Sequence, residues 1–419
     1  MQVVYPRCCG IDVHKKGVTV CVLISHEDGT VERQFRSFGT MTGQLQALSE
    51  WLRQWQVTHL AMESTGVYWQ PVYNLLEAND RTVLLVNAQH VQALPGRKTD
   101  TKDSEWLADL LRHGLLRGSF IPPAAIRELR DLTRYRKTLV QERSQEANRV
   151  QKLLEGANIK LAAVATNVLG VSGRQMLDAI IAGEEDPAAL AEFARASLRK
   201  KLPQLRQALE GRVKPHHRLL LTQLLGHIDY LTTAIAEIEQ EVERCLAPFA
   251  EAVTLLQTIP GIGAIAAAAI IAAPTPEGRP CVDMGRFPSA KHLASWAGVC
   301  PGNRESAGKR LSGKTRTGNT WLRGILGEVA WAAARTRDTY FSAQLRRLAR
   351  KRGTKRALLA VAHSVLTTIY HVLRTKRPYH DLGPDHFDHL DAERLQHHHV
   401  QRLEQLGYTV TITPKAAAG

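Results

Sequence analysis

Cysteine is scarce in this chain, and the few that occur lack the spacing of a disulfide framework or a zinc site. No Cys-x-x-Cys pair occurs among the six, so reduced thiols are expected. The sequence also lacks a Gly-x-x-x-x-Gly-Lys-Ser/Thr phosphate loop and an apolar N-terminal signal core. Its most continuous late apolar run, "ALLAVAHSVLTTIYHVL", is interrupted by His363 and His371 and is short for a membrane span. We therefore expect a folded cytoplasmic protein that needs no ATP. The cysteines are Cys8, Cys9, Cys21, Cys245, Cys281 and Cys300.

Acidic residues are also in short supply, and the shortage is local. The chain has 55 Lys and Arg against 40 Asp and Glu. Residues 1–113 hold 11 basic and 12 acidic residues, whereas residues 301–356 hold 15 basic and 3 acidic ones. A basic run can be a solvated face, but an excess this concentrated is more typical of a polyanion-binding surface. Nucleic acid is favoured over membrane because no lipidation motif or membrane-inserting amphipathic segment accompanies the charge.

The N-terminal third has the pattern of an α/β domain. "CCGIDVHKKGVTVCVLISHEDGTVERQFRSF" indicates three strands joined by Lys-Lys-Gly and Asp-Gly turns. A helix ("TGQLQALSEWLRQWQ"), a strand ("THLAMES"), a helix ("YWQPVYNLLEAN") and a strand ("TVLLVN") follow. This order predicts a sheet with an antiparallel meander at one edge.

The rest of the chain is expected to be mostly helical. Apolar residues recur every three or four positions from about Ala124 to Glu155 and from Pro215 to Leu246. Both segments predict long helices, which we expect to form a coiled-coil pair. After the Pro- and Gly-rich stretch at 274–280, the basic segment is also expected to be mostly helical.

Four carboxylates fall where these elements end or begin. Asp12 ends the first strand, Glu63 ends the fourth, and Asp100 and Asp103 open a helix after the fifth. Acids three apart share a helix face and repel each other, so a cation is needed nearby, and hard oxygen ligands select Mg²⁺ or Mn²⁺. Taken singly, Asp100 could be a helix cap, Asp12 a turn residue and Glu63 a solvated strand end. The set in this order favours a metal site that acts on a phosphodiester.

Two further motifs each have two interpretations. "TIPGIGAI" resembles the hairpin of helix-hairpin-helix modules, whose backbone N–H groups contact DNA phosphates, but tight packing of two helices explains its glycines equally well. Trp321 and Trp331 could stack nucleic-acid bases, although a role on the core face of a helix is the preferred interpretation.

"GIDVHK", "MESTGVYW" and "KTDTKDSEWLADLL" together resemble the RuvC-like, ribonuclease-H-fold domain of the DEDD transposases of the insertion-sequence one-ten family. "TIPGIGAIAAAAIIA" and "RFPSAKHLASWAGVCPGNRESAGKRLSGKTRTGNTWLRGILGEVAWAA" resemble that family's C-terminal transposase domain. The resemblance implies four regions: a RuvC-like DEDD domain, a helical coiled-coil region, a transposase domain with a basic face and a serine, and an extension. We place these at residues 1–120, 121–250, 251–375 and 376–419.

The resemblance also implies roles for particular residues. The acidic, metal-binding tetrad falls on Asp12, Glu63, Asp100 and Asp103, and the family's nucleophilic serine falls on Ser306. In this chain Ala307 follows Ser306, whereas the Ser-Gly step common in the family occurs at Ser312. Ser306 is preferred because its distance from "GVCP" and "RTGN" fits better, and Ser312 stays an alternative. A phosphate contact is the simpler role for a serine in such a loop. The candidate nucleic-acid contacts are Lys309, Arg310, Lys314, Arg316 and Arg323.

The implied protein is a bacterial, nucleoid-associated transposase and recombinase of an insertion sequence. Its implied partners are donor and target DNA, a bridge RNA encoded by the element, and further copies of the chain in a dimer or tetramer. Two other function classes stay open. A metal-dependent, structure-selective nuclease of the junction-resolvase type needs only the acids, and a non-catalytic regulator needs none of these side chains. Only a serine recombinase leaves protein joined to DNA.

Overall fold

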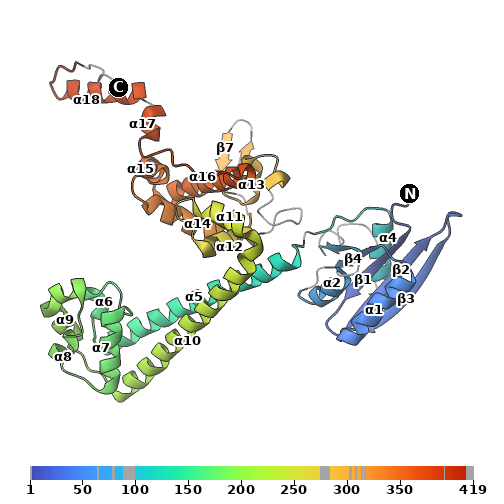
Figure 1. Ribbon diagram of the computed structural model, residues 1–419, viewed down its shortest axis with the longest axis horizontal. Coiled ribbons are helices and arrows are strands. Elements are labelled where there is room, and N and C mark those ends of the chain that lie inside the picture. Colours follow the sequence, from blue (N-terminus) through green and yellow to red (C-terminus); the bar gives the residue numbers. More distant parts are fainter. Residues whose placement is uncertain are drawn as a thin grey trace. The chain divides into compact units, whose positions relative to one another are not determined.

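The computed structural model describes residues 2–63, 66–77, 81–87, 100–119, 121–273, 284–301, 304–306, 309–312, 315, 318–390 and 392–411. Side chains are described for all of these except residues 100–102, 286, 304–306, 309–312, 393–395 and 398. The chain forms two compact units, one built from Met1–Pro122 and the other beginning at Pro123 (Figure 1).

The first unit is an α/β domain around a mixed sheet of order β3-β2-β1-β4-β5. The three N-terminal strands pair antiparallel, whereas β4 is parallel to β1 and β5 is parallel to β4. The predicted meander, helix, strand, helix, strand order is therefore confirmed. The elements are β1 (Arg7–Val13), β2 (Gly17–Ser25), β3 (Val31–Gly39), α1 (Thr42–Gln54), β4 (His59–Glu63), α2 (Trp69–Glu77), β5 (Thr82–Val86) and α4 (Asp100–Arg112).

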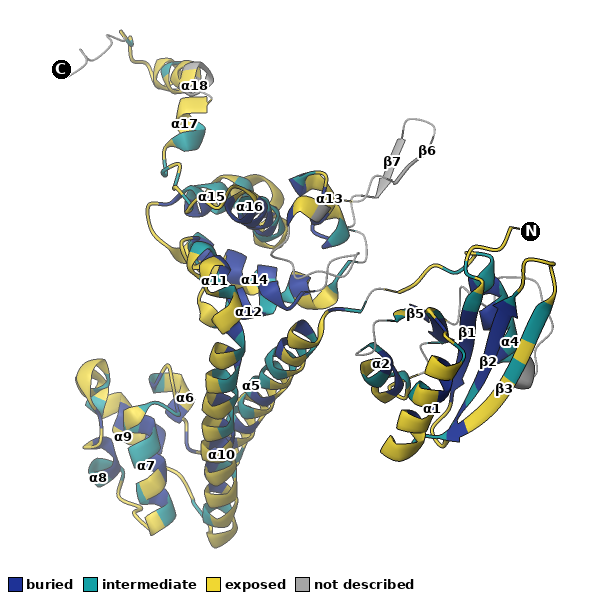
Figure 2. Cartoon of the chain, turned by 45° about the vertical axis from the view of Figure 1, so that its right-hand side comes forward, coloured by how far each residue is buried: buried dark blue, intermediate teal, exposed yellow. Residues whose placement is uncertain are grey.

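Alternation along the strands gives the sheet two apolar faces. Ile11 and Met62 belong to the core shared with α1 and α2, whereas Cys8 and Ala61 pack with Ala108 of α4 on the other face. Figure 2 shows the result, with β1 and β2 mostly buried and the edge strand β3 mostly exposed or half-buried. Strands covered on both faces require apolar residues at nearly every position, which is why β1 and β2 read as almost continuous apolar runs.

The cysteines of this sheet are enclosed thiols. Cys8, Cys9 and Cys21 are fully buried, and the five cysteines that the structure describes are free. Burial raises the pKa of Cys8 and of Cys21 to about 12, and it raises the pKa of Cys9 well above the usual range. These groups therefore stay protonated at neutral pH, as expected for reduced thiols that act as small apolar side chains.

Two long helices begin the second unit. α5 (Ala124–Gly156) and α10 (Pro215–Leu246) match the predicted segments and run antiparallel, since Arg136 pairs with Glu239 and the later Glu146 pairs with the earlier His227. Leu139, Leu231 and Ile235 form a buried seam between them. The long helical pair is confirmed, and a supercoiled coiled-coil geometry stays a prediction.

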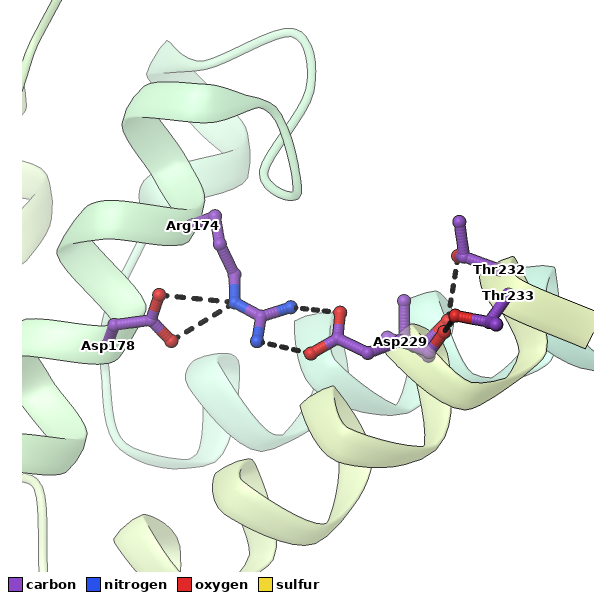
Figure 3. Close-up of polar contacts among 6 residues, drawn as sticks. Arg174, Asp178, Asp229, Thr232 and Thr233 are labelled. Carbon is purple, nitrogen blue, oxygen red and sulfur yellow. Dashed lines mark hydrogen bonds and ion pairs between the residues drawn. The ribbon is translucent and has the colours of Figure 1, made fainter. Parts of the chain in front are cut away.

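A small helical bundle separates the two long helices in sequence. Its elements are α6 (Leu161–Val164), α7 (Val171–Ala182), α8 (Pro187–Ala191), a 3₁₀ turn (Ala196–Lys201) and α9 (Leu202–Leu209). Their core includes Val150 of α5 and Leu221 of α10. The Arg174 guanidinium on α7 donates two bonds of 2.7 Å to Asp229 of α10 and a 3.0 Å bond to Asp178 (Figure 3). The bundle is thereby tied to the helical pair by apolar contact and by a forked ion pair.

Six further helices pack around one core at the other end of the pair. Ile126 of α5 and Val242 of α10 belong to this core, so the long helices are anchored in it. Its elements are α11 (Ala250–Gln257), α12 (Ala264–Ile271), α13 (Ala290–Trp296), α14 (Thr320–Arg335), α15 (Tyr340–Arg352) and α16 (Thr354–Thr375), with 3₁₀ turns at Ala247–Phe249 and Met284–Arg286. Two short strands, β6 (Arg304–Ser306) and β7 (Lys309–Ser312), precede α14, and α17 (His386–Leu390) and α18 (Ala392–Gln405) follow α16.

α16 is the one described helix that is long and apolar enough to cross a membrane by length and composition. Half of its most apolar window is buried inside the protein. Val361, Val365 and Ile369 lie on its buried face in the core of the second unit. Its apolar character is explained by packing against neighbouring helices.

Candidate functional site

The predicted carboxylates of the first unit lie at neighbouring strand ends. β1 and β4 pair in parallel with Ile11 opposite Met62, so Asp12 and Glu63 occupy the next step of the ladder. Ile11 and Met62 face α1 and α2, and by alternation Asp12 and Glu63 belong to the face that α4 covers. The expected convergence of Asp12 and Glu63 thus has a backbone basis in the sheet register.

α4 approaches this face so closely that only glycine fits beneath it. A Cβ atom on Gly10 would lie 2.0 Å from the Ser104 carbonyl oxygen and 2.5 Å from the Ala108 amide nitrogen. Nearer the start of β1, the Cys8 thiol donates to the Ala108 carbonyl oxygen at 3.4 Å. α4 therefore runs opposite to β1. Two residues of strand advance about 6.6 Å, or about four helical residues, which places Asp12 beside the first turn of α4.

Asp12 is a buried acid, with 8% of its surface exposed. Its Oδ2 atom lies 3.0 Å from Nε2 of His14, an otherwise exposed side chain just beyond β1. Sequence reasoning passed over His14, although it stands inside the quoted "GIDVHK". The signal available was its place two residues after an acid at a strand end, where both side chains fall on one face.

The acids of α4 differ in how they are paired. Glu105 accepts from Arg33 of β3 at 2.9 Å, and Asp109 accepts from Arg112 at 2.7 Å. Among the described residues, Asp103 forms no ion pair. Asp100 is the first residue of α4, and its side chain lies outside the description. The described cations next to α4 therefore neutralise acids other than Asp103.

The donor chemistry of this edge suits a hard cation. Asp12, Glu63 and Asp103 offer carboxylate oxygens, the ligands that Mg²⁺ and Mn²⁺ prefer. Among the described side chains, no three His, Cys, Asp or Glu residues are gathered closely enough to hold a metal ion. The described residues thus supply suitable ligands at one sheet edge without completing a coordination shell.

The serines of the second unit lie on a short antiparallel hairpin, not on a helix or an open loop. Ser306 ends β6 and pairs with Lys309, next to the chain reversal, whereas Ser312 ends β7 and pairs with Arg304. The two candidate nucleophiles therefore occupy opposite ends of the hairpin. Arg310 lies opposite Glu305 in the backbone register of the hairpin. Lys314 and Arg316 lie outside the described residues.

A backbone bridge closes the base of the hairpin, and the residue before the α14 cap packs against the turn after α13. Pro301 and Thr315 form an isolated bridge, and a Cβ on Gly318 would lie 2.4 Å from the Gly298 amide nitrogen. Asn319 then caps α14, its Oδ1 atom accepting from the backbone N–H groups of Trp321 and Leu322. Gly318 thus allows a close approach and Asn319 provides a helix cap. Arg323 lies exposed one turn into α14.

The tryptophans of α14 do not cover its core face. Trp321 is 40% exposed and Trp331 is 42% exposed. The Arg134 guanidinium lies 4.9 Å from the Trp321 ring centroid, and that of Arg335 lies 5.4 Å from Trp331. The preferred core interpretation was wrong, because Leu322, Leu326 and Val329 already fill the buried stripe.

Packing explains the first of the two glycines of "TIPGIGAI", whereas a Cβ on the second, Gly263, would meet open space. Gly261 has φ of +85°, and a Cβ there would lie 2.6 Å from the Val329 carbonyl oxygen on α14. The turn before α12 therefore rests directly on the α14 backbone. Of the two interpretations of this motif, helix packing accounts for Gly261 without a DNA phosphate.

Segments of both units match known transposase families. Residues 9–159 match a transposase family model, the DEDD transposase of IS110 type, and residues 253–346 match the model of the transposase IS116/IS110/IS902 family. The "Insertion element IS110 uncharacterized 43.6 kDa protein" of Streptomyces coelicolor is 27% identical over 69% of this chain and 74% of its own length.

Two further relatives are more distant or partial. The "Putative transposase y4qE" of Sinorhizobium fredii is 24% identical over 77% of this chain and 70% of its own length. The "Pilin gene-inverting protein" of Moraxella bovis is 28% identical over 36% of this chain and 47% of its own length. The two family matches together span more than half of the chain, carry both motif sets quoted from the sequence, and lie in one order along it. The chain therefore belongs to the IS110 family of DEDD transposases.

Proposed function

We propose that this transposase cuts and rejoins DNA strands through a serine nucleophile and a divalent-metal carboxylate site, guided by an RNA encoded by its element. The observation that carries the proposal is the parallel register that sets Asp12 beside Glu63 under α4. It is supported by the family to which the chain belongs and by the lack of an ion pair at Asp103 among the described residues.

The tetrad is proposed as the metal-binding part. Asp12, Glu63, Asp100 and Asp103 would hold Mg²⁺ or Mn²⁺, which when bound would neutralise charge on a phosphodiester. His14 would orient the Asp12 carboxylate, since its Nε2 atom lies 3.0 Å from Asp12 Oδ2.

Ser306 is proposed as the nucleophile. Its Oγ would form a bond to phosphorus as the bond from phosphorus to the leaving sugar oxygen breaks, and the hydroxyl proton would pass to a base. Lys309 lies opposite Ser306 in the backbone register of the hairpin. The same basic segment contains Arg310, Lys314, Arg316 and Arg323. Their charges would bind the phosphate and stabilise the charge that develops on it. The phosphoserine ester would conserve the energy of the broken phosphodiester bond for resealing, so no ATP would be needed.

The test of the nucleophile is a covalent adduct. Wild type, Ser306→Ala and Ser312→Ala are incubated with labelled DNA, Mg²⁺ and the element's RNA, then separated under denaturing conditions. Loss of the protein-DNA adduct in Ser306→Ala alone supports the assignment, and loss in Ser312→Ala alone moves the nucleophile to β7. Cleavage by Ser306→Ala without any adduct would favour the structure-selective nuclease, because that activity needs only the four acids.

The test of the metal site uses a control on the same helix. Asp12→Asn and Asp103→Asn should each lower Mg²⁺-dependent strand exchange at least about 100-fold while the protein stays folded. Asp109→Asn should stay active, because Asp109 is paired with Arg112 near the end of α4. Full activity of Asp12→Asn, or of wild type in EDTA, would exclude the metal role.

We extend the proposal to the domain limits predicted from the sequence and to a cytoplasmic, nucleoid-associated location. We also propose that the protein acts as an oligomer. A dimer or tetramer would suit a reaction that joins two DNA duplexes. Light scattering with and without DNA and RNA measures this, and a monomer in every condition would oppose it.

A further inference from the structure

A second concentration of positive charge lies apart in sequence from the serine hairpin. Residues 346–356 contain seven cations and no acid. All seven are exposed, five near the end of α15 and two in the first turn of α16. All but the first lie beyond the segment that matches the family model, which ends at residue 346. We call Arg346, Arg347, Arg350, Lys351, Arg352, Lys355 and Arg356 the α15–α16 corner.

Helix stability does not explain this arrangement. Cations near the end of α15 favour its macrodipole, but Lys355 and Arg356 lie at the start of α16, where positive charge is unfavourable by about 0.3–1 kcal/mol each. Arg346 with Arg350 and Arg347 with Lys351 are like-charge pairs four residues apart, each destabilising by roughly 0.2–0.5 kcal/mol. The charges thus oppose local folding at several positions.

The turn between the helices holds the two groups of charges together. Gly353 has φ of +77° and ψ of 156°, a backbone conformation that is sterically unfavourable for residues with a Cβ atom. α15 and α16 pack along each other, and Gln344 Nε2 donates to Ser364 Oγ at 2.8 Å. The corner is therefore presented on two ordered helices.

Contacts within the protein use little of this charge. Arg346 donates to the Ser342 carbonyl oxygen, and the Arg347 guanidinium lies 5.1 Å from the Phe387 ring centroid. Among the described residues, no carboxylate forms an ion pair with Arg350, Lys351, Lys355 or Arg356. These four cations have charge available for an external anion.

We propose that the α15–α16 corner binds the phosphate backbone of duplex DNA flanking the strand that the enzyme cuts. This inference rests on the proposed function for its partner. Residues 346–356 contain no aromatic side chain that could stack an unpaired base, which favours a duplex over a single strand. Arginine predominates among the cations, and its planar fork suits phosphate oxygens. Contacts of this kind position a duplex without reading its sequence.

The test replaces three exposed cations and measures salt dependence. The corner variant carries Arg350→Gln, Lys351→Gln and Lys355→Gln, since glutamine keeps helix propensity. The control variant removes equal charge from the bundle region through Arg195→Gln, Lys200→Gln and Arg212→Gln, all exposed. Full-length protein is titrated with duplex DNA of arbitrary sequence at several salt concentrations, and circular dichroism checks the fold.

The corner variant should bind duplex DNA more weakly, by up to about eight-fold per lost contact near 0.1 M salt, and its logarithmic salt slope should flatten by about one unit per contact. The control variant should match wild type. Equal losses in the two variants would reduce the effect to net charge and overturn the inference. A folded corner variant with unchanged DNA binding, or one that loses binding only to a structured RNA, would also overturn it.

A variant in the hairpin distinguishes failure of this inference from failure of the proposed function. If Arg310→Ala weakens DNA binding and the corner variant does not, the corner inference fails and the proposed function stands. If wild type itself does not bind DNA at any salt concentration, the proposed function fails.

Discussion

The contact between β1 and α4 predicts a large effect for the smallest possible substitution, Gly10→Ala. The added methyl group would lie 2.0 Å from the Ser104 carbonyl oxygen and 2.9 Å from the Leu107 Cβ atom. Two of its three nearest atoms belong to the helix backbone, so no side-chain rotation can relieve the overlap. Since Cβ contacts under 3.0 Å essentially do not occur, α4 must withdraw by about 1 Å.

Two consequences follow from that displacement. Overpacking of a close-packed core typically costs about 1–3 kcal/mol, so the free energy of unfolding of the first unit should fall by that amount. α4 also carries Asp103, a proposed metal ligand, and a misplacement of about 1 Å in an active site can cost about 100-fold in rate. Gly10→Ala should therefore lower strand exchange far more than the fraction of unfolded protein explains.

The control is Gly17→Ala in β2, where a Cβ would lie 3.5 Å from the Phe38 carbonyl oxygen, an ordinary contact. Urea unfolding followed by circular dichroism gives the stability change, and the adduct assay at a temperature where both variants are folded gives the rate. Equal stability and activity of the two variants would refute the close contact between β1 and α4. A destabilised but fully active Gly10→Ala would refute the role of α4 in the site.

Two further predictions concern stability. Arg174→Ala should lower the free energy of unfolding of the second unit by no more than about 1 kcal/mol, because Asp178 and Asp229 are about half exposed and solvent screens such pairs; a double-mutant cycle with Asp229→Ala measures the coupling. Burial raises the pKa of Cys8 and of Cys21 to about 12, against 9.0 for a free thiol. The free energy of unfolding should therefore be unaffected by these thiols below pH 9. As the pH rises from 9 toward 12, it should fall by up to about 1.4 kcal/mol per pH unit for each thiol. Cys21→Ala should reduce this alkaline loss in pH-dependent melts, and an identical alkaline slope in wild type and variant would contradict it.

The parts of the fold that were predictable from the sequence have strong periodic patterns. Strands β1, β2 and β4 and helices α5 and α10 bury apolar residues at regular spacing, so their pattern indicates them directly. The exposed edge strand β3 is indicated instead by the Asp-Gly turn that precedes it. The hairpin of β6 and β7 has no such stripe, because residues 301–318 consist largely of Gly, Ser, Thr, Lys and Arg. The short helices α6 and α8 hold too few turns for a periodic signal and depend on packing against α5 and α10.

Only part of the candidate site's geometry was predictable from the sequence. Parallel strands end at one edge, so Asp12 and Glu63 could be expected together. The pairing of Arg33 with Glu105, and not with Asp103, depends on tertiary distances that no spacing encodes. The same holds for the contact between His14 and Asp12, and for the exposure of Trp321 and Trp331.

The packing gives each of the first four residues of "GIDVHK" a physical reason. Gly10 and Asp12 are two apart and share a strand face, so the position that lets α4 touch β1 also sets Asp12 level with the first turn of that helix. Ile11 and Val13 alternate into the opposite core, which holds the strand in register and fixes the direction of Asp12. A larger residue at position 10 would separate the strand acid from the helix acids while leaving every carboxylate in the sequence. Gly10 would therefore act as a positioning residue of the proposed site, one that a search for charged groups alone does not find.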